Sequence, residues 1–433
     1  MKLPKSTFIF FYFMGLLPIG LISFGNVDPL KLIIIACYLI ALFRVLFSSR
    51  HALPVIFKGP SRVIFLVLGA IALAYFHMVL TTDRLSTIFL WFAGGYVFFW
   101  IIIYEVTSYE SIVILFKRLG WMVLAATVLL IIFYFAPSIL EGPLLDARMG
   151  SFRGFMQGHP RIFTPGMIYI TLAVVYAFCR VAFFREPAKT KLLLGTLAII
   201  IFIVIALVSS VRTNIVGILL SAAVILVYRF NLRKTLLISA LVAAIVGMVI
   251  ILPGTYNSYI KERLVGVAGV AQFDYRGAIS GNISYGKKEY ETYYWRVTEA
   301  AMVIKLIDTW DKQMFGAMGL WYGYGPDYQA VQPHIGYAGL YYCSGLVGLL
   351  AFAFFIIYFS LKAVRMLRLY RGHQYEYLAV FVALVWFIML LTAASNAVFY
   401  LEDNIILVSA AALSIVMTKL VADSSKPEKM SST

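Results

Sequence analysis

The chain has 433 residues, 62% of them hydrophobic and 13% charged, with a formal net charge of +16 and a mean hydropathy of +0.90. A water-soluble domain carries about 25% charged residues. This composition therefore excludes an ordinary soluble protein and indicates a chain whose solvent is largely lipid.

The apolar stretches are continuous rather than alternating, and each is close to the roughly 20 residues that one helical crossing of a bilayer needs. About twelve crossings can be drawn. In chain order they are Thr7–Phe24, Leu30–Phe47, Val63–Leu80, Leu85–Tyr104, Leu119–Ala136, Gly166–Phe184, Leu192–Val208, Thr213–Tyr228, Leu236–Leu252, Gly336–Leu361, Tyr377–Ala394 and Asn404–Leu420. We therefore predict an all-α, polytopic transmembrane helix bundle, whose first stretch is a membrane helix rather than a cleaved signal peptide.

Two long connections interrupt the predicted bundle. Residues 137–165 form a smaller loop, and the large loop that follows later contains Glu289–Ile307, which has the spacing of an amphipathic helix. The predicted organisation is nine transmembrane helices over 1–252, a large, partly helical loop over 253–335, three further helices over 336–421 and a polar tail over 422–433.

Basic residues give the predicted orientation. If the N-terminus is cytoplasmic, the whole excess of 16 positive charges lies on the cytoplasmic side, and basic and acidic residues balance on the outer side. The reverse orientation would place a basic cluster outside, namely Lys362, Arg365, Arg368 and Arg371. We predict that both termini are cytoplasmic and that both long loops lie outside. The positive charge is then a signal of topology, and we expect no nucleic-acid partner.

Two arginines stand out on the predicted outer side. Arg212 lies in a short turn between two crossings, where a charge is costly unless it is paired or functional. Arg296 falls on the otherwise apolar face of the amphipathic helix in the large loop. Both suit an anionic ligand. The alternatives are that Arg212 extends to the membrane interface and that Arg296 pairs with Glu299 at the surface.

His334 lies where the large loop is predicted to re-enter the membrane. A histidine titrates near neutral pH, so it can serve as a general base. The glycine- and aromatic-rich stretch Gly316–Pro326 precedes it and contains Tyr324 and Gly325, which could line a saccharide site. A hydrogen-bonded interfacial histidine and a plain turn are the alternatives.

The smaller outer loop contains a second group of candidate binding residues, which are Arg148, Arg153, His159 and Arg161. Arginines spaced by glycines suit an anion such as a diphosphate, although a hydrated loop would have the same composition. The sequence has no Walker A loop, HExxH or CxxC motif, and no acidic cluster suited to a divalent metal. We therefore predict no metal and no cofactor, with arginine neutralising a phosphate leaving group.

This pattern of an outer arginine after a Ser-Ser turn, an arginine in a large outer loop, a histidine before the next helix and two spaced glycines resembles a known family. It is similar to the O-antigen polymerase and O-antigen ligase superfamily, the membrane glycosyltransferases of the GT-C type. The resemblance covers about Val208–Leu350, and Arg148–Pro165 is similar to the arginine–glycine loop of many members. The matching residues are Arg212, Arg296, His334, Gly345 and Gly348.

The resemblance implies that Arg212 and Arg296 bind the diphosphate of an undecaprenyl diphosphate-linked oligosaccharide, and that His334 activates the acceptor hydroxyl. It also implies a bacterial inner membrane with the active site in the periplasm, and membrane lipids as surroundings. A chain-length-regulating co-polymerase remains open as a partner. Ile335 stands where ligases usually carry Asn, Ser or Gln, which favours an O-antigen polymerase.

Two other functions remain open. An O-antigen ligase would use the same donor and transfer the glycan to lipid A-core. A polysaccharide or lipid transporter would carry charged residues deep in the bundle, whereas the predicted helices here are nearly free of charge at their centres.

Overall fold

The computed structural model describes residues 59–82, 88–135, 153–156, 159–162, 167–205, 212–229, 307–317, 322–323, 329–330, 336–393 and 401–424, together with the single positions Leu39 and Phe43. The helices are α4 (Ser61–Thr82), α5 (Ile88–Glu105), α6 (Tyr109–Phe135), α8 (Met167–Phe183), α9 (Ala188–Val204), α10 (Arg212–Arg229), α15 (Trp310–Phe315), α16 (Gly336–Leu369), α17 (Glu376–Ala393) and α18 (Leu401–Ser424). Four short strands form two antiparallel ribbons, in which β1 (Arg153–Met156) pairs with β2 (His159–Ile162) and β3 (Tyr322–Gly323) with β4 (Gln329–Ala330).

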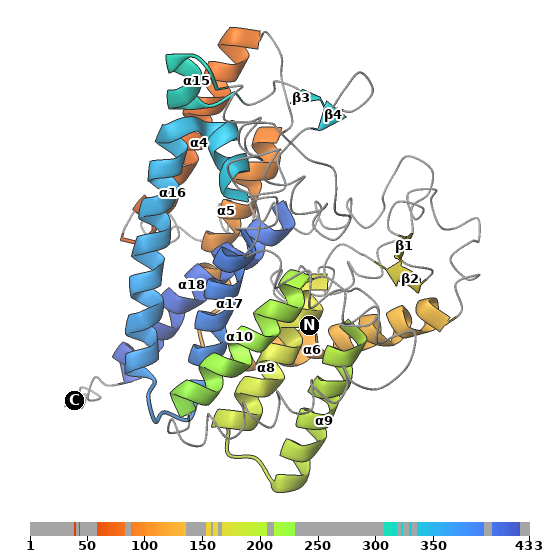
Figure 1. The fold of residues 1–433 in the computed structure, drawn as a ribbon. Coiled ribbons are helices and arrows are strands. Elements are labelled where there is room, and N and C mark those ends of the chain that lie inside the picture. The colour runs from red at the N-terminus through yellow and green to blue at the C-terminus, as the bar shows by residue number, and fades with distance from the viewer. Residues whose placement is uncertain are drawn as a thin grey trace, which may run out of the picture.

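The predicted all-α fold is confirmed for these residues, apart from the two short ribbons. Each predicted crossing that falls within them is helical (Figure 1). Four helical stretches are long and apolar enough to span a bilayer, namely Ser61–Thr81, Gly336–Leu369, Glu376–Ala393 and Asn404–Ala422. The predicted helices Thr7–Phe24, Leu236–Leu252 and Glu289–Ile307 lie outside the described helices, as does all of Leu30–Phe47 except its two single positions.

Helix α6 extends beyond the predicted crossing Leu119–Ala136. Helix α6 begins at Tyr109 rather than at Leu119, and it runs on through Lys117 and Arg118. The Ser108 hydroxyl accepts a hydrogen bond from the backbone N–H of Ser111 at 3.2 Å, so Ser108 caps the helix. The two charged side chains are exposed, and the helix continues through them without a break. They therefore separate a more polar first part of α6 from its apolar second part.

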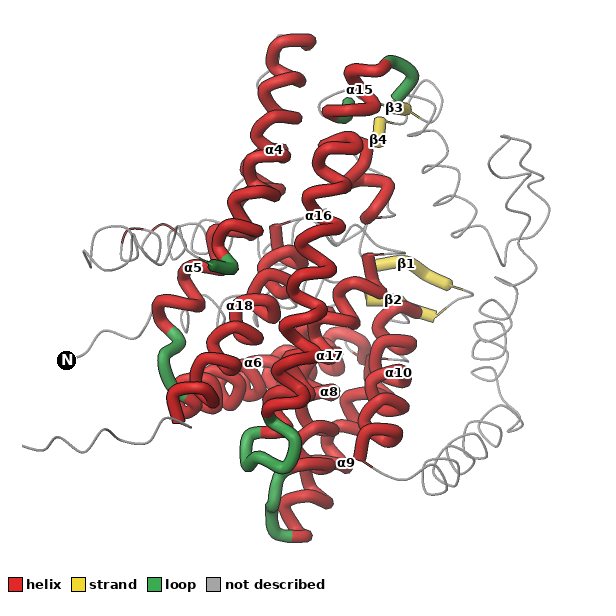
Figure 2. Tube along the Cα trace, turned by 90° about the vertical axis from the view of Figure 1, so that its left-hand side faces the viewer, coloured by secondary structure: helices red, strands yellow, loops and turns green. Residues whose placement is uncertain are grey.

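Helix α17 is at the centre of the bundle, because α8, α10, α16 and α18 all pack against it (Figure 2). The indole N–H of Trp386 on α17 donates to the Ser360 hydroxyl of α16 at 3.0 Å. Its ring lies 5.5 Å from that of Phe355, which in turn contacts Tyr96 of α5 at 5.8 Å. Around these rings, α4 packs along α16 and α5 along α18.

Buried hydroxyls inside the bundle bond to the carbonyl oxygens of their own helices. Thr392 donates to Ile388, and Ser344 donates to Leu340 at 2.7 Å. Ser409 donates to Ile405 in the same way. A hydroxyl satisfied one turn earlier on its own helix needs no water, as an apolar surrounding requires.

One face of α16 is exposed and apolar. Its residues recur every three or four positions, and they are Leu346, Leu350, Phe354, Ile357 and Leu361. The opposite face buries Phe352, Phe355 and Phe359 in the bundle. This outward stripe is what a helix presents to lipid, and we call it the α16 lipid stripe.

Candidate functional site

The structure describes part of the predicted site. Five predicted residues lie outside the described residues, so their roles stay predictions: Arg148, Arg296, Tyr324, Gly325 and His334. Arg212 is the first residue of α10, and its position is described through the backbone. The structure therefore tests which elements meet near these residues, rather than the contacts of the side chains themselves.

The β1–β2 ribbon carries three of the predicted anion-binding residues. Arg153 is opposite Ile162, Arg161 is opposite Gly154, and His159 is opposite Met156. Since positions alternate between the two faces of a strand, His159 and Arg161 occupy one face of the ribbon and Arg153 the other. An anion on one face would thus meet two of the three positions. Strand β2 contacts α6.

The starts of α10 and α16 lie at the same end of the bundle. A Cβ built at Gly217, in the second turn of α10, would lie 3.4 Å from a methyl group of Ile388 near the end of α17. Two residues further along α17, the carbonyl oxygen of Leu390 accepts a 2.9 Å hydrogen bond from the Tyr337 hydroxyl. Tyr337 is the second residue of α16. Arg212 therefore lies at the end of the bundle where α16, which follows His334, begins.

Helix α15 docks on this end of α16 through backbone atoms. The N–H of Ala317 donates to the carbonyl oxygen of Tyr342 at 2.7 Å. Gly345 interrupts α16 with φ 58° and ψ −159°, and Gly316 ends α15 with φ 86°. A Cβ at Gly345 would lie 2.5 Å from the backbone of Met314 and Gly316, and one at Gly316 would lie 2.7 Å from the backbone of Cys343. Neither position has room for a side chain.

Gly345 and Gly348 are the two glycines that match the family resemblance, and the structure explains why glycine is needed at both positions. Gly345 adopts a left-handed conformation that other residues rarely adopt, at the place where α15 touches α16. A Cβ at Gly348 would lie 1.9 Å from the Ser344 hydroxyl oxygen, one turn earlier on the same helix. Both glycines therefore shape the first turns of the helix that follows His334.

A polar contact that the sequence did not predict ties α15 to α4. The Nε2 atom of His77 lies 3.2 Å from a carboxylate oxygen of Asp311, and the His77 ring lies 5.4 Å from that of Phe315. A hydrogen bond with the Thr309 side chain lowers the pKa of Asp311, and His77 adds to this shift. A hydrogen bond from Lys312 lowers the pKa of Asp308 in the same segment. The only sequence signal was a histidine near the end of an apolar helix.

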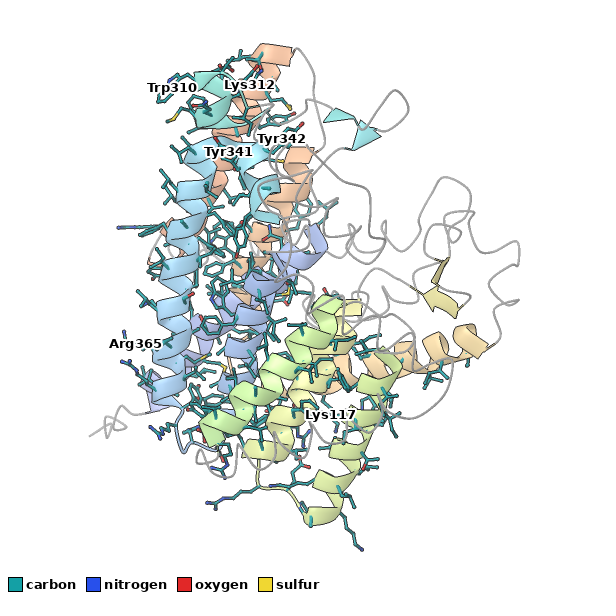
Figure 3. All side chains as sticks on the ribbon, viewed as in Figure 1. Lys117, Trp310, Lys312, Tyr341, Tyr342 and Arg365 are labelled. Atoms are coloured by element: carbon teal, nitrogen blue, oxygen red, sulfur yellow. The ribbon has the colours of Figure 1, made fainter. Side chains whose placement is uncertain are left out.

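The opposite end of the bundle is basic. Figure 3 shows Trp310 and Lys312 of α15 at one end of α16 and Arg365 near the other. The described basic residues at that second end include Arg180, Arg185, Lys189, Lys191, Arg229, Lys362, Arg365, Arg368 and Arg371. Tyr370 lies there too and hydrogen bonds to Tyr109 at 2.7 Å and to the Met417 carbonyl oxygen at 2.9 Å. The two ends of the helices therefore differ strongly in charge.

Comparison with known proteins gives no identification. No protein-family profile matches the sequence, and a search of curated proteins finds no match.

Proposed function

We propose that this chain is a membrane glycosyltransferase of the O-antigen polymerase type. The observation that best supports it is the meeting of α10, α15, α16 and α17 at one end of the bundle, linked by Gly217 with Ile388 and by Tyr337 with Leu390. This arrangement brings the start of α10, with Arg212, to the end where the segment carrying His334 enters α16.

The proposed topology has about twelve crossings of a bacterial inner membrane, with both termini in the cytoplasm. It is supported by the charge difference between the two ends of the helices, because basic residues concentrate on the cytoplasmic side of membrane proteins. The basic end of α16 is then cytoplasmic, and the end with α15 faces the periplasm. Lipid-linked donor and acceptor would meet at that outer end.

The proposed reaction forms a bond between an acceptor sugar oxygen and the anomeric carbon of the donor glycan. The bond from that carbon to the diphosphate oxygen breaks, and undecaprenyl diphosphate leaves with the electron pair. His334 takes the proton of the acceptor hydroxyl, a step worth about 10²–10⁴-fold in rate. Arg212 and Arg296 offset the charge of the departing diphosphate, as preorganised cations do in other sites.

Helix α15 has a supporting role in this proposal. It precedes the segment that holds Tyr324, Gly325 and His334, and it is fixed to α16 by the Gly316–Gly345 contact. Both ends of the segment from 317 to 336 are therefore attached to the same helix. Such anchoring limits where a catalytic histidine in that segment can lie, which is the usual requirement for efficient general base catalysis.

The decisive experiment mixes purified protein with lipid-linked repeat units from the host, without nucleotide or added metal, and separates the products on a gel. A ladder that is lost in His334→Ala but kept in Lys312→Ala supports a polymerase with His334 as base. Lys312 is a suitable control because it lies at the same end and pairs only with the exposed Asp308 among the described residues. Transfer that appears only when lipid A-core is added would instead indicate the ligase, and unchanged donor in both reactions would contradict glycosyl transfer.

A further inference from the structure

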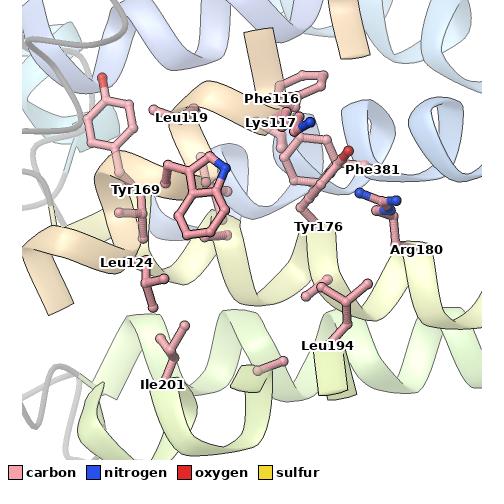
Figure 4. A pocket seen from close by; sticks show the side chains of 18 of the residues that line it. Phe116, Lys117, Leu119, Leu124, Tyr169, Tyr176, Arg180, Leu194, Ile201 and Phe381 are labelled. Atoms are coloured by element: carbon pink, nitrogen blue, oxygen red, sulfur yellow. The ribbon is translucent and has the colours of Figure 1, made fainter. Parts of the chain in front are cut away.

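An apolar cavity of about 380 Å³ lies between α6, α8, α9, α17 and α18 (Figure 4). Leu124, Leu194 and Ile201 line its walls in Figure 4, and Phe381 of α17 contributes an aromatic wall. Protein interiors have few voids larger than a water molecule. A cavity of this size therefore belongs to the size class of ligand sites.

Water is a poor occupant of the apolar part of this cavity, away from Tyr176 and Arg180. Ser409, the hydroxyl residue that α18 contributes to the lining, already donates to the carbonyl oxygen of Ile405. Most of the remaining lining residues are aliphatic or aromatic. A buried water needs two to four polar partners, and apolar cavities of this kind stay dry. The chemistry of the walls matches a hydrocarbon chain.

The cavity has a polar end formed by three side chains. They are Lys117 of α6 and, from α8, both Tyr176 and Arg180, and Figure 4 shows them close together. The rings of Phe116 and Tyr176 are 5.6 Å apart, which brings the neighbouring Lys117 next to α8. Arg180 forms an ion pair with Glu186, whereas Lys117 has no acidic partner among the described residues.

The surroundings of this polar end are also basic. The turn between α8 and α9 and the start of α9 carry Arg185, Lys189 and Lys191, against one acidic residue, Glu186. Trp121 and Leu193, which line the cavity, are exposed. A tryptophan at such a rim is typical of a membrane interface. Because both exposed residues are apolar, a lipid can enter between them without crossing a polar barrier.

We propose that this cavity binds an anionic glycerophospholipid, with one acyl chain between α6, α8 and α9 and its phosphate held by Lys117 and Arg180. Basic pockets between transmembrane helices on the cytoplasmic side are suited to anionic head groups. Lys117 supplies the uncompensated positive charge, and Arg180 supplies further N–H donors while it remains paired with Glu186. A zwitterionic lipid could fill the same apolar walls but would gain less from the basic end.

This lipid site does not depend on the proposed sugar transfer. It is built from residues at the basic end of the bundle, whereas Arg212 begins α10 at the other end. The protein can therefore bind phospholipid here whether or not it transfers a glycan.

The test measures lipid retained by the full chain in native mass spectrometry after detergent extraction from nanodiscs of phosphatidylglycerol and phosphatidylethanolamine. We expect one phosphatidylglycerol to remain on the wild-type protein, and Lys117→Gln to reduce its retention about fivefold, the effect of one basic residue on an anionic lipid. Ala173→Phe, which fills the cavity, should displace the lipid. Lys362→Gln is the matched control, because Lys362 is a basic residue of the same end that does not line the cavity.

A second measurement covers the case in which Ala173→Phe fails to fold. Phosphatidylglycerol brominated in its acyl chain should quench the tryptophan fluorescence of the wild-type protein more than that of Trp121→Phe. Equal retention of the two lipids, or equal loss in Lys117→Gln and Lys362→Gln, would overturn the proposal. Undecaprenyl phosphate that displaces phosphatidylglycerol when it is present at the lower concentration of the two would also overturn the proposal. The site would then belong to a polyprenyl carrier.

Discussion

Gly316 and Gly345 pack backbone against backbone, and neither has space for a methyl group. The Cβ that an alanine would add at Gly345 lies 2.5 Å from the backbone nitrogen of Gly316. The two residues come from different elements, the end of α15 and the interruption of α16. The segment 307–317 is therefore held by the helix that follows the proposed catalytic histidine.

Gly345→Ala tests this contact, and Gly372→Ala is its control. Both glycines have positive φ, of 58° and 79°, but a Cβ at Gly372 would meet nothing within 4 Å. The positive φ alone costs about 1–3 kcal/mol for a residue with a side chain, and both variants carry a cost of this kind. Forcing a methyl group into the packed site adds about 1–3 kcal/mol for Gly345→Ala alone. The unfolding midpoint in detergent measures the difference, and equal midpoints for the two variants would contradict the close contact.

The acidic residues of the α15 segment predict that the stability of this segment depends on pH. The pKa values of Asp308 and Asp311 are lowered from the ordinary value of 3.8. A carboxyl with a lowered pKa stabilises the folded form above its ordinary value and loses this effect as the pH falls through the lowered value. Cleavage of the segment by pepsin should therefore increase as the pH falls below about 4.

The matched variant for that experiment is Asp308→Asn combined with Asp311→Asn. It should remove the acid step, so that cleavage of the segment relative to an unfolded substrate at each pH no longer changes over the same range. If wild type and the double variant show the same pH profile, these two carboxylates do not hold the segment.

Arg212→Lys separates the two possible roles of the arginine in the proposed reaction. A lysine keeps the charge but loses the planar pair of N–H donors that binds a diphosphate in two places. We expect Arg212→Ala to lower polymerisation about 10²–10³-fold, in line with the loss of one preorganised charge stabiliser, and Arg212→Lys to recover only part of it. Rates are measured with saturating lipid-linked donor. Full activity of Arg212→Ala would exclude the residue from the reaction.

Tyr370 links three helices at the basic end and predicts a specific loss of stability. Its hydroxyl has one proton, so it donates to the Met417 carbonyl oxygen and accepts from Tyr109. Burial raises the pKa of Tyr370, so the hydroxyl stays protonated. Tyr370→Phe removes both of these hydrogen bonds, although the Met417 carbonyl keeps its place in the α18 ladder, and the expected loss is about 1–2 kcal/mol.

Tyr358→Phe is the control for this substitution. The Tyr358 ring lies on α16 beneath the Lys362 ammonium at 5.2 Å, and removal of its hydroxyl should change the unfolding midpoint little. Equal midpoints for Tyr358→Phe and Tyr370→Phe in detergent would show that the Tyr370 bridge contributes nothing.

The sequence predicts the described helices well because membrane hydropathy is a property of each segment by itself. The predicted crossing Leu119–Ala136 does not reveal that α6 begins at Tyr109, because Lys117 and Arg118 end the apolar run although a helix can continue through exposed charges. The contact between Gly316 and Gly345 was also beyond prediction. It depends on two backbone segments that touch at glycines. The spacing of apolar residues in the sequence carries no information about such a contact. His77 and Asp311, 234 positions apart, gave no local signal for the same reason.

The α16 lipid stripe bears on the thickness of the membrane that suits this protein. From Leu346 to Leu361 the helix rises about 23 Å, at 1.5 Å per residue, and the charged residues Lys362 and Arg365 follow at once. A typical bilayer has a hydrocarbon core of about 30 Å. The apolar turns from Gly336 to Gly345 supply the remaining length. Helix α16 is therefore long enough to cross such a core without thinning the bilayer, and the stripe marks the part of the crossing that acyl chains can touch.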